Sequence, residues 1–153
     1  AVEIGTRLVV DTSGEPLRQL AGAGVFLIKP NIRELEELVG ESLPYESSQV
    51  QAARRLIEEG CCEAVALSLE RGGALAVTAD RTRRVLAPTV PIRSKVGAGD
   101  SMVGGMVLSL SRGVDLLEAV RFGVAAGAAA VMTDGTELCR REDAERLYRA
   151  MPE

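Results

Sequence analysis

The sequence of 153 residues contains no histidine. This absence excludes serine–histidine triads, histidine metal ligands and histidine general bases together. Any proton transfer must then depend on a carboxylate, a lysine or a cysteine. Only three cysteines are present; Cys61 and Cys62 are neighbours, and Cys139 is alone. The odd count and the lack of metal-binding spacing argue against a disulfide framework, so we expect a reducing, cytoplasmic environment.

Long apolar runs and blocks of basic residues are missing as well. The run of small apolar residues at 124–132 is too short and too rich in alanine to cross a bilayer, so no membrane span is expected. With 18 Lys and Arg against 22 Asp and Glu, the net charge is −4. This balance gives no indication of binding to nucleic acid or to an anionic membrane. A site for an anionic ligand must therefore be built locally, from backbone amides and one or two cations.

Short apolar segments alternate with amphipathic ones along the chain, which indicates an α/β fold. Strands are expected at residues 7–10, 25–28, 64–69, 74–78 and 83–86, and helices at residues 16–21, 32–39, 47–59, 99–111, 115–131 and 142–150. This order predicts a single domain over residues 1–153, with a mainly parallel sheet and an antiparallel edge. Ligands of such sheets bind outside the carboxyl ends of the strands, so we expect three loops to meet there: 29–31, 68–73 and 97–100.

The most informative motif is a glycine turn at residues 96–100, Val-Gly-Ala-Gly-Asp, which leads into an apolar helical stretch. Glycines at a helix entrance let a ligand approach the backbone amides, and the helix dipole favours an anion there. A phosphate would repel Asp100, so its carboxylate needs another role, such as accepting a proton from an attacking hydroxyl. Two alternatives are an N-capping aspartate and a methyl-donor loop for S-adenosylmethionine, although the latter normally opens its domain.

Three residues before and within the second expected helix offer contacts to a phosphate or a metal ion. Asn31 and Glu34 are three residues apart and face one side of the first helical turn, so they could hold Mg²⁺ or its waters. A capping box explains the same spacing equally well. Lys29 could neutralise a phosphate oxygen, or it could be an ordinary solvated lysine.

Two further glycine-containing segments allow both a functional and a structural interpretation. In residues 68–73, Ser-Leu-Glu-Arg-Gly-Gly, the hydroxyl of Ser68 and the glycine amides suit a phosphate, but a tight hairpin between two strands is at least as good an explanation. Gly123 and Gly127 lie one helical turn apart and flatten one face of their helix. A planar base or a second helix could lie there, and the sequence alone favours helix packing.

Taken in order, these motifs resemble those of the ribokinase-like (PfkB) family of carbohydrate kinases. The resemblance covers essentially the whole chain and is carried by residues 29–34, 68–73, 96–105, 122–127 and 134–136. It implies a ribokinase-like three-layer α/β fold, of which this chain corresponds to the carboxy-terminal, nucleotide-binding half. One position departs from the family pattern, since Glu70 stands where a glycine is usual.

The resemblance also implies a role for each matching residue. Asp100 would be the catalytic base, and the amides of Gly97, Ala98 and Gly99 would form an anion hole for the transferring phosphoryl group. Asn31 and Glu34 would organise Mg²⁺. Contacts to ATP are implied for a larger set: Lys29, Asn31, Glu34, Ser68, Gly73, Phe122 and Gly127. Some family members bind K⁺ near the loops that would include Ser94 and Gly135.

The implied reaction is phosphorylation of a primary hydroxyl by ATP, with fructose 6-phosphate as the expected acceptor. Tagatose 6-phosphate, fructose 1-phosphate, ribose and nucleosides remain alternatives, because the acceptor-selecting residues and the lid belong to the amino-terminal half. The complete enzyme is expected to be a homodimer. Without its other half, this chain should bind nucleotide but transfer little phosphate. A non-catalytic nucleotide-binding or oligomerisation module is the competing hypothesis.

Overall fold

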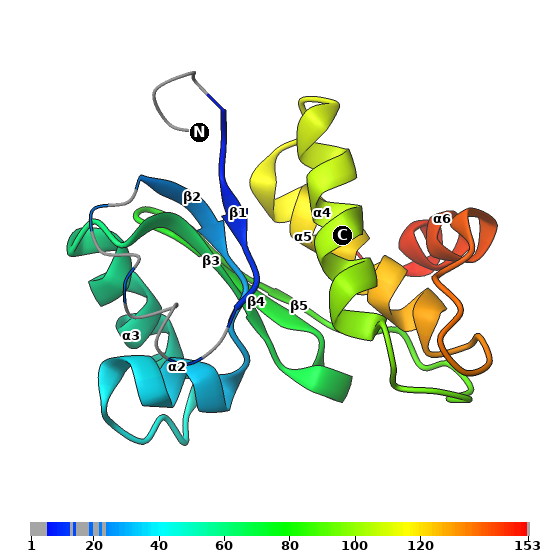
Figure 1. Ribbon diagram of the computed structural model, residues 1–153, viewed down its shortest axis with the longest axis horizontal. Helices are drawn as coiled ribbons and strands as arrows, with labels where there is room; N and C mark the ends of the chain where they lie inside the picture. Colours follow the sequence, from blue (N-terminus) through cyan, green and yellow to red (C-terminus); the bar gives the residue numbers. More distant parts are fainter. Residues whose placement is uncertain (1–5, 13, 15–18, 20–21, 23, 153) are drawn as a thin grey trace. The chain divides into compact units, whose positions relative to one another are not determined.

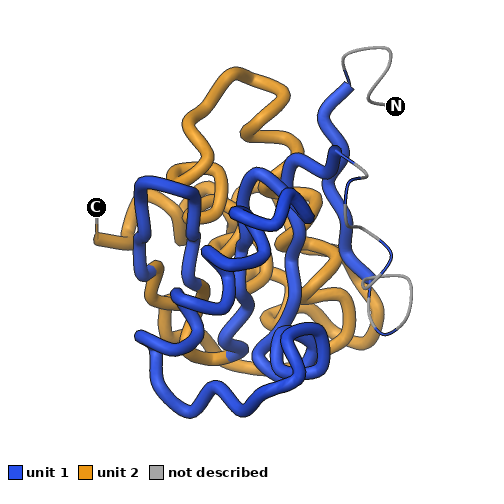
Figure 2. The backbone as a smooth tube through the Cα atoms, turned by 90° about the vertical axis from the view of Figure 1, so that its left-hand side faces the viewer, with its two compact units in different colours: residues 1–70, 75–84 blue, residues 71–74, 85–153 orange. Residues whose placement is uncertain are grey.

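The computed structural model describes residues 6–12, 14, 19, 22 and 24–152. The chain divides into two compact units, residues 1–70 with 75–84, and residues 71–74 with 85–153 (Figure 2). Each unit is described by itself below. The helix expected at residues 16–21 lies almost entirely outside the described residues.

The first unit contains a sheet of five strands in the order β1-β2-β3-β4-β5 (Figure 1). Two terminal residues of these strands, Ala74 and Val85, belong to the second unit. The strands are β1 (Val9–Val10), β2 (Val25–Ile28), β3 (Cys62–Ser68), β4 (Ala74–Thr78) and β5 (Thr82–Val85). β1, β2 and β3 pair in parallel. The links on either side of β4 are too short for a parallel crossover, so β4 runs antiparallel to its neighbours. The mixed sheet confirms the expected antiparallel edge.

Two helices cover one side of this sheet, α2 (Ile32–Val39) and α3 (Glu46–Glu58) (Figure 1). α2 begins at Asn31, which caps it, and ends at Gly40, whose φ of 75° is the left-handed conformation that a glycine adopts without strain. The helices and strands share one core of aliphatic side chains, including Val25, Ile28, Leu35, Leu43, Leu56, Val65, Leu67, Leu75 and Val77. Burial of this apolar surface fixes the strand ends on which the first part of the candidate site depends.

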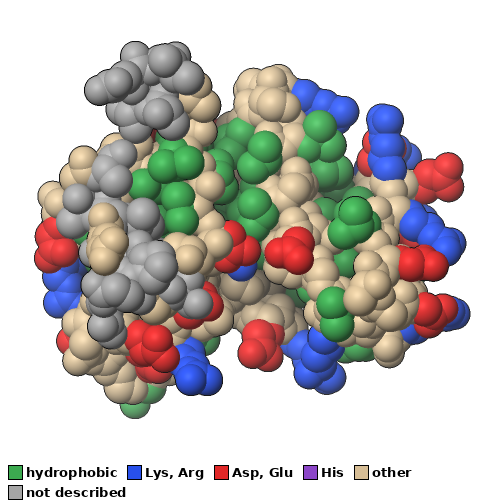
Figure 3. Space-filling model, viewed as in Figure 1, with side chains coloured by type: hydrophobic (Ala, Val, Ile, Leu, Met, Phe, Trp, Pro, Cys, Tyr) green, Lys and Arg blue, Asp and Glu red, His purple; other side chains and the backbone are tan. Residues whose placement is uncertain are grey.

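The second unit contains three helices, α4 (Ala98–Ser111), α5 (Leu116–Ala130) and α6 (Arg141–Ala150). α5 packs against both α4 and α6. The close contact between α4 and α5 requires a glycine at position 105, because a Cβ atom on Gly105 would lie 2.9 Å from Cβ of Ala126. Val107 and Leu108 of α4 are exposed, and Figure 3 shows hydrophobic side chains at the surface in the region of this helix.

Arg121 of α5 binds the end of α6. Its buried guanidinium donates hydrogen bonds to the carbonyl oxygens of Met151, at 2.7 Å, and Tyr148, at 3.2 Å, and it pairs with Glu118 at 2.9 Å. The carbonyls at the end of α6 thus receive donors that the helix itself cannot supply. Burial, together with the hydrogen bond that Tyr148 donates to Glu118, raises the pKa of Tyr148. This network was not apparent from the sequence.

The expected strands and helices agree with the structure to within two residues at each described boundary. The largest differences concern two strands of the parallel part. The strand expected at residues 7–10 is limited to Val9–Val10, and β3 begins two residues early because Cys62 pairs with Val25 of β2. Within the described part of the chain, no helix is long and apolar enough to cross a membrane.

Candidate active site

The loops that follow β2 and β3 meet at one edge of the sheet. The amide of Ser68 donates a hydrogen bond of 2.8 Å to the carbonyl of Pro30, and Asn31 and Ser68 form an isolated parallel bridge. The expected convergence is therefore confirmed for residues 29–31 and 68. The third loop, 97–100, belongs to the other unit, so its meeting with these two stays a prediction.

Lys29 is not an ordinary solvated lysine. Only 8% of the residue is exposed, and its ammonium lies 3.2 Å from the carboxylate of Asp11. The pairing follows from register, because Val10 and Ile28 are partners in the parallel ladder and the next residue of each strand emerges at the same edge. This ion pair was not expected from the sequence, because its two residues follow different strands. A buried, paired ammonium with a fixed position is suited to a phosphate oxygen.

Asn31 and Glu34 form the capping box that the sequence allowed. The side chain of Asn31 accepts a hydrogen bond of 2.9 Å from the amide of Glu34, whose own carboxylate accepts one of 2.8 Å from the amide of Asn31. These bonds fix both side chains at the start of α2 and still leave Oε1 of Glu34 available to a ligand.

The two side chains also fit the role of Mg²⁺ ligands or ligands of its waters. Across the described residues, no three His, Cys, Asp or Glu side chains gather into a metal cage. Mg²⁺ is commonly held by one or two carboxylates together with water and substrate phosphates, so a single carboxylate beside an amide oxygen is a sufficient protein contribution.

In the second unit, Gly97 is the N-cap of α4. Its φ of 78° lies in the left-handed region, and no side chain caps this end of the helix. The first amides of an α-helix have no acceptor within the helix, so those of Ala98 and Gly99 are available to an anion. The proposed alternative of an N-capping aspartate is wrong, because Asp100 lies inside the first turn.

Asp100 is exposed to solvent. Its carboxylate is therefore accessible to a hydroxyl group of a substrate, which burial among apolar side chains would prevent. The next residue, Ser101, is buried, and among the described residues nothing bonds to its hydroxyl oxygen. No role was expected for Ser101 from the sequence.

Gly73 and Glu70 lie in the short connection between β3 and β4, which contains the single 3₁₀ turn Glu70–Gly72. A Cβ atom on Gly73 would lie 2.0 Å from the carbonyl oxygen of Val85, so this glycine is required by the close approach of the backbone. Glu70 has a φ of 51°, a backbone conformation that glycine adopts with less strain than glutamate does. The hairpin interpretation is confirmed, and a contact from Gly73 to nucleotide stays a prediction.

Phe122 and Gly127 both take part in helix packing. The ring of Phe122 is half-buried and meets the ring of Tyr148 edge-on, with centroids 5.4 Å apart. Gly127 is buried against α4, where a Cβ atom would lie 3.0 Å from the carbonyl oxygen of Ala98. Helix packing is therefore what the structure shows at Gly127, and contacts of either residue with a nucleotide stay predictions.

The two loops named for K⁺ are joined directly. The hydroxyl of Ser94 donates a hydrogen bond of 2.6 Å to the carbonyl of Gly135, and Arg93 pairs with Asp134 at 3.0 Å. These contacts bring oxygen atoms of both loops together, although K⁺ binding itself stays a prediction.

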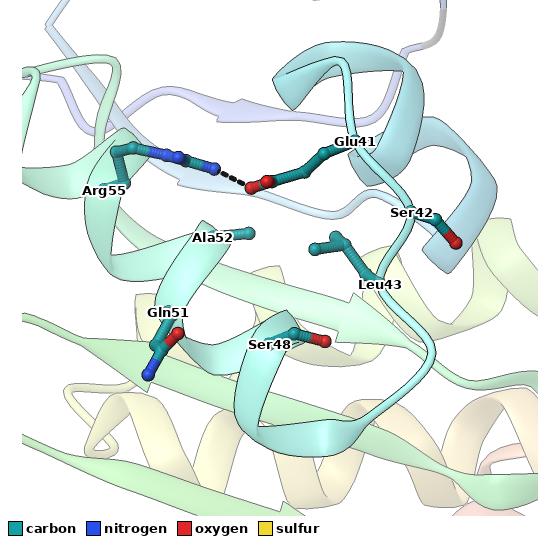
Figure 4. Close-up of a pocket in the computed structure, with 7 residues that line it drawn as sticks. All are labelled: Glu41, Ser42, Leu43, Ser48, Gln51, Ala52 and Arg55. Atoms are coloured by element: carbon teal, nitrogen blue, oxygen red, sulfur yellow. Dashed lines mark hydrogen bonds and ion pairs between the residues drawn. The ribbon is translucent and has the colours of Figure 1, made fainter.

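A cavity of about 350 Å³ opens in the first unit, between the end of α2 and the start of α3 (Figure 4). It is lined by Glu41, Ser42, Leu43, Ser48, Gln51, Ala52 and Arg55. Figure 4 shows the ion pair of Arg55 with Glu41 across it. None of the residues expected to bind ATP or to carry out catalysis lines this cavity, so it is separate from the candidate site.

Comparison with known proteins agrees with this arrangement of motifs. The family model described as "pfkB family carbohydrate kinase" matches residues 3–143. The chain belongs to the pfkB family of carbohydrate kinases. Its sequence is 45% identical to ATP-dependent 6-phosphofructokinase isozyme 2 of Mycobacterium tuberculosis, over 94% of this chain and 42% of that protein. It is 33% identical to 1-phosphofructokinase of Borreliella burgdorferi, over 92% of this chain and 45% of that protein.

The fold of this pfkB chain matches solved structures equally well. The crystal structure of phosphofructokinase-2 from Escherichia coli in complex with potassium has a TM-score of 0.93 and 42% sequence identity, covering 98% of this chain and 49% of that one. This agreement confirms the ribokinase-like α/β fold. The chain spans about half the length of the relatives that it matches.

Proposed function

We propose that this chain supplies the ATP site and the catalytic base of a kinase that phosphorylates a sugar phosphate. The observation that carries the proposal is the start of α4, where an uncapped turn with Gly97 as N-cap is followed by the exposed carboxylate of Asp100. Gly97 leaves the first amides of α4 without a side-chain acceptor, so a phosphate can bind them.

In the proposed reaction, Asp100 accepts the proton of a primary hydroxyl while that oxygen attacks the γ-phosphorus of ATP. The bond from the γ-phosphorus to the bridging oxygen breaks, and ADP leaves with the electron pair. Negative charge spreads over the phosphoryl oxygens, and the amides of Gly97, Ala98 and Gly99 stabilise it. Bound Mg²⁺ would neutralise charge on the phosphates.

In this proposal, residues of the first unit contact Mg²⁺ and the phosphates of the nucleotide. Asn31 and Glu34 hold Mg²⁺ or its waters, which is supported by their fixed orientation in the capping box. Lys29 and Ser68 contact phosphate oxygens, supported by the buried ammonium at one strand end and the bridge that joins Ser68 to Asn31.

Fructose 6-phosphate is the acceptor that we propose, since the relative with 45% identity is named a 6-phosphofructokinase. A second candidate is fructose 1-phosphate, because another relative is named a 1-phosphofructokinase. We also propose that the complete enzyme is a cytoplasmic homodimer and that K⁺ binds near Ser94 and Gly135. Assays of the full-length protein compare kcat/KM for the two sugar phosphates. The same assays with and without K⁺ test the proposed K⁺ site.

Replacing Asp100 tests the central assignment. In the full-length protein, Asp100→Asn should lower kcat by about three orders of magnitude, because an amide cannot accept the proton, while Mg-ATP binding and folding are retained. Glu142→Gln is the matched control, since Glu142 is an exposed acid in the first turn of α6. Turnover of Asp100→Asn close to that of the wild type would refute the base assignment. Mg-ATP binding without any sugar phosphorylation by the wild type would favour the non-catalytic module.

A further inference from the structure

The contact between α5 and the first turn of α4 assigns a role to Gly127. A Cβ atom at this position would lie 3.0 Å from the carbonyl oxygen of Ala98, 3.9 Å from its carbonyl carbon and 3.5 Å from Cβ of Met102. We infer that Gly127 is a positioning residue for the anion hole, acting through Ala98 and not through contact with the nucleotide. This inference rests on the function proposed above.

The contact point lies within the proposed hole itself. The carbonyl of Ala98 and the amide N–H of Gly99 belong to one planar peptide unit. A displacement of the carbonyl oxygen therefore tilts or moves the N–H of Gly99, which is one of the three donors of the hole. A separation of 3.0 Å is a few tenths of an ångström too short for an ordinary contact of Cβ, so the peptide must yield by that amount.

Two other helical glycines of this unit, Gly123 and Gly104, do not contact Ala98. A Cβ atom on Gly123 would meet the flexible side chain of Met106 at 2.6 Å and the carbonyl of Met102 at 2.8 Å, one turn further along α4. On Gly104 it would meet nothing within 4 Å. Gly127 is thus distinguished from both by its contact with the backbone of Ala98.

Local helix stability argues for a different residue at this position. Alanine is favoured over glycine inside a helix by about 1 kcal/mol, and the flanking residues of α5 are Ala125, Ala126, Ala128, Ala129 and Ala130. A glycine in the midst of these alanines is explained by the space that Ala98 needs. Gly127 thus maintains the geometry of the first turn of α4, although a glycine lowers the stability of α5 itself.

The test compares Gly127→Ala with two other glycine variants in the full-length protein. We expect Gly127→Ala to lower kcat about tenfold, because small displacements of a preorganised donor act on the transition state, with the dissociation constant of Mg-ATP changed less than threefold. Gly123→Ala should lower the unfolding midpoint more than Gly127→Ala does, yet lower kcat of the folded enzyme less. Gly104→Ala measures the gain in helix propensity alone and should raise the midpoint.

A second measurement is independent of turnover. The backbone amide resonance of Gly99 should shift in Gly127→Ala and stay in place in Gly104→Ala. The inference is overturned if kcat of Gly127→Ala remains within twofold of the wild type, if its loss of activity follows the unfolded fraction, or if the change lies in ATP affinity. A wild-type protein that phosphorylates no sugar would instead overturn the proposed function, and this inference with it.

Discussion

The two units of this chain are stabilised in opposite ways. The core of the first unit contains branched aliphatic side chains, such as Leu35, Leu67 and Leu75, each almost fully buried between the sheet and its helices. In the second unit, α4 and α5 approach so closely that glycine and alanine occupy the contact. Removing atoms should therefore destabilise the first unit, and adding atoms should destabilise the second.

The candidate functional groups also differ between the two units. The first unit presents side chains at strand ends, where Lys29, Asn31 and Ser68 are held by register and by a capping box. The second unit presents backbone amides at a helix start, together with one carboxylate. Side chains can be aligned by neighbouring strands, whereas amides are aligned only when the whole helix is held in place.

The largest effect on stability is expected for Gly73→Ala. A methyl group there would lie 2.0 Å from the carbonyl oxygen of Val85 and 2.7 Å from the amide nitrogen of Ala87, and both are backbone atoms that cannot rotate away. We expect a loss of more than about 3 kcal/mol or failure to fold. Gly40→Ala is the control, since Gly40 has a φ of 75° with nothing within 4 Å. It should cost about 1 kcal/mol in urea unfolding; equal effects would contradict the steric argument.

Leu75→Ala should have the next largest effect. Leu75 is fully buried in the core of the first unit, so its truncation leaves a cavity and should cost about 3 kcal/mol. Leu86→Ala removes the same atoms from a residue that is 58% exposed, and it should change the free energy of unfolding by less than about 0.5 kcal/mol. Similar losses for the two variants would show that the first unit does not depend on its aliphatic core.

Gly123→Ala makes the reverse change in the second unit. Overlap with Met106 and with the carbonyl of Met102 should destabilise the contact between α4 and α5 by about 2 kcal/mol. Gly104→Ala adds the same methyl group to open space and should stabilise the protein by up to about 1 kcal/mol. Chemical unfolding measures both. If Gly123→Ala is as stable as Gly104→Ala, an added methyl group does not destabilise the contact between α4 and α5.

Glu70→Gly should stabilise the protein slightly. Its φ of 51° places a side chain in the left-handed region, which costs about 1 kcal/mol relative to glycine. Glu63→Gly, at an exposed position of β3 without a positive φ, should instead be destabilising. Thermal unfolding of both variants should give shifts of opposite sign, and a lower midpoint for Glu70→Gly would contradict this explanation.

The smallest effect concerns pH. Burial, followed by the neighbouring Cys61, raises the pKa of the Cys62 thiol to about 12. An unfolded chain ionises this thiol near its ordinary value of about 9, so stability is unaffected below that pH and decreases as pH rises toward 12. Unfolding experiments between pH 8 and 10.5 should show a shallower decrease for Cys62→Ala. An unchanged slope would exclude a contribution from this thiol.

Local patterns predicted much of the structure correctly. The apolar spacing of residues 32–39 and Asn31 before them gave the bounds of α2, because capping and amphipathicity are properties of adjacent residues. The glycine turn likewise indicated the start of α4 to within one residue. The convergence of residues 29–31 with Ser68 followed from the general rule for parallel strands, and the bridge between Asn31 and Ser68 confirms it.

Specific side-chain contacts between residues distant in sequence were not predicted. Asp11 precedes Lys29 by 18 positions along the chain, and their ion pair exists only because β1 and β2 are in register. Arg121 binds carbonyls of Tyr148 and Met151 that belong to another helix. In each case the sequence shows the residue type, but the partner is determined by how the elements pack.

Sequence alone determined which groups this chain carries. The absence of histidine left carboxylates, lysines and cysteines for proton transfer, and the glycine turn pointed to Asp100 beside a run of amides. Tertiary structure decided what the small residues do, since the same spacing of Gly123 and Gly127 suits either a base or a second helix. The structure shows helix packing at Gly127, with the carbonyl of Ala98 next to it. Chemical identity is local to the chain, whereas the space around a residue is created by packing.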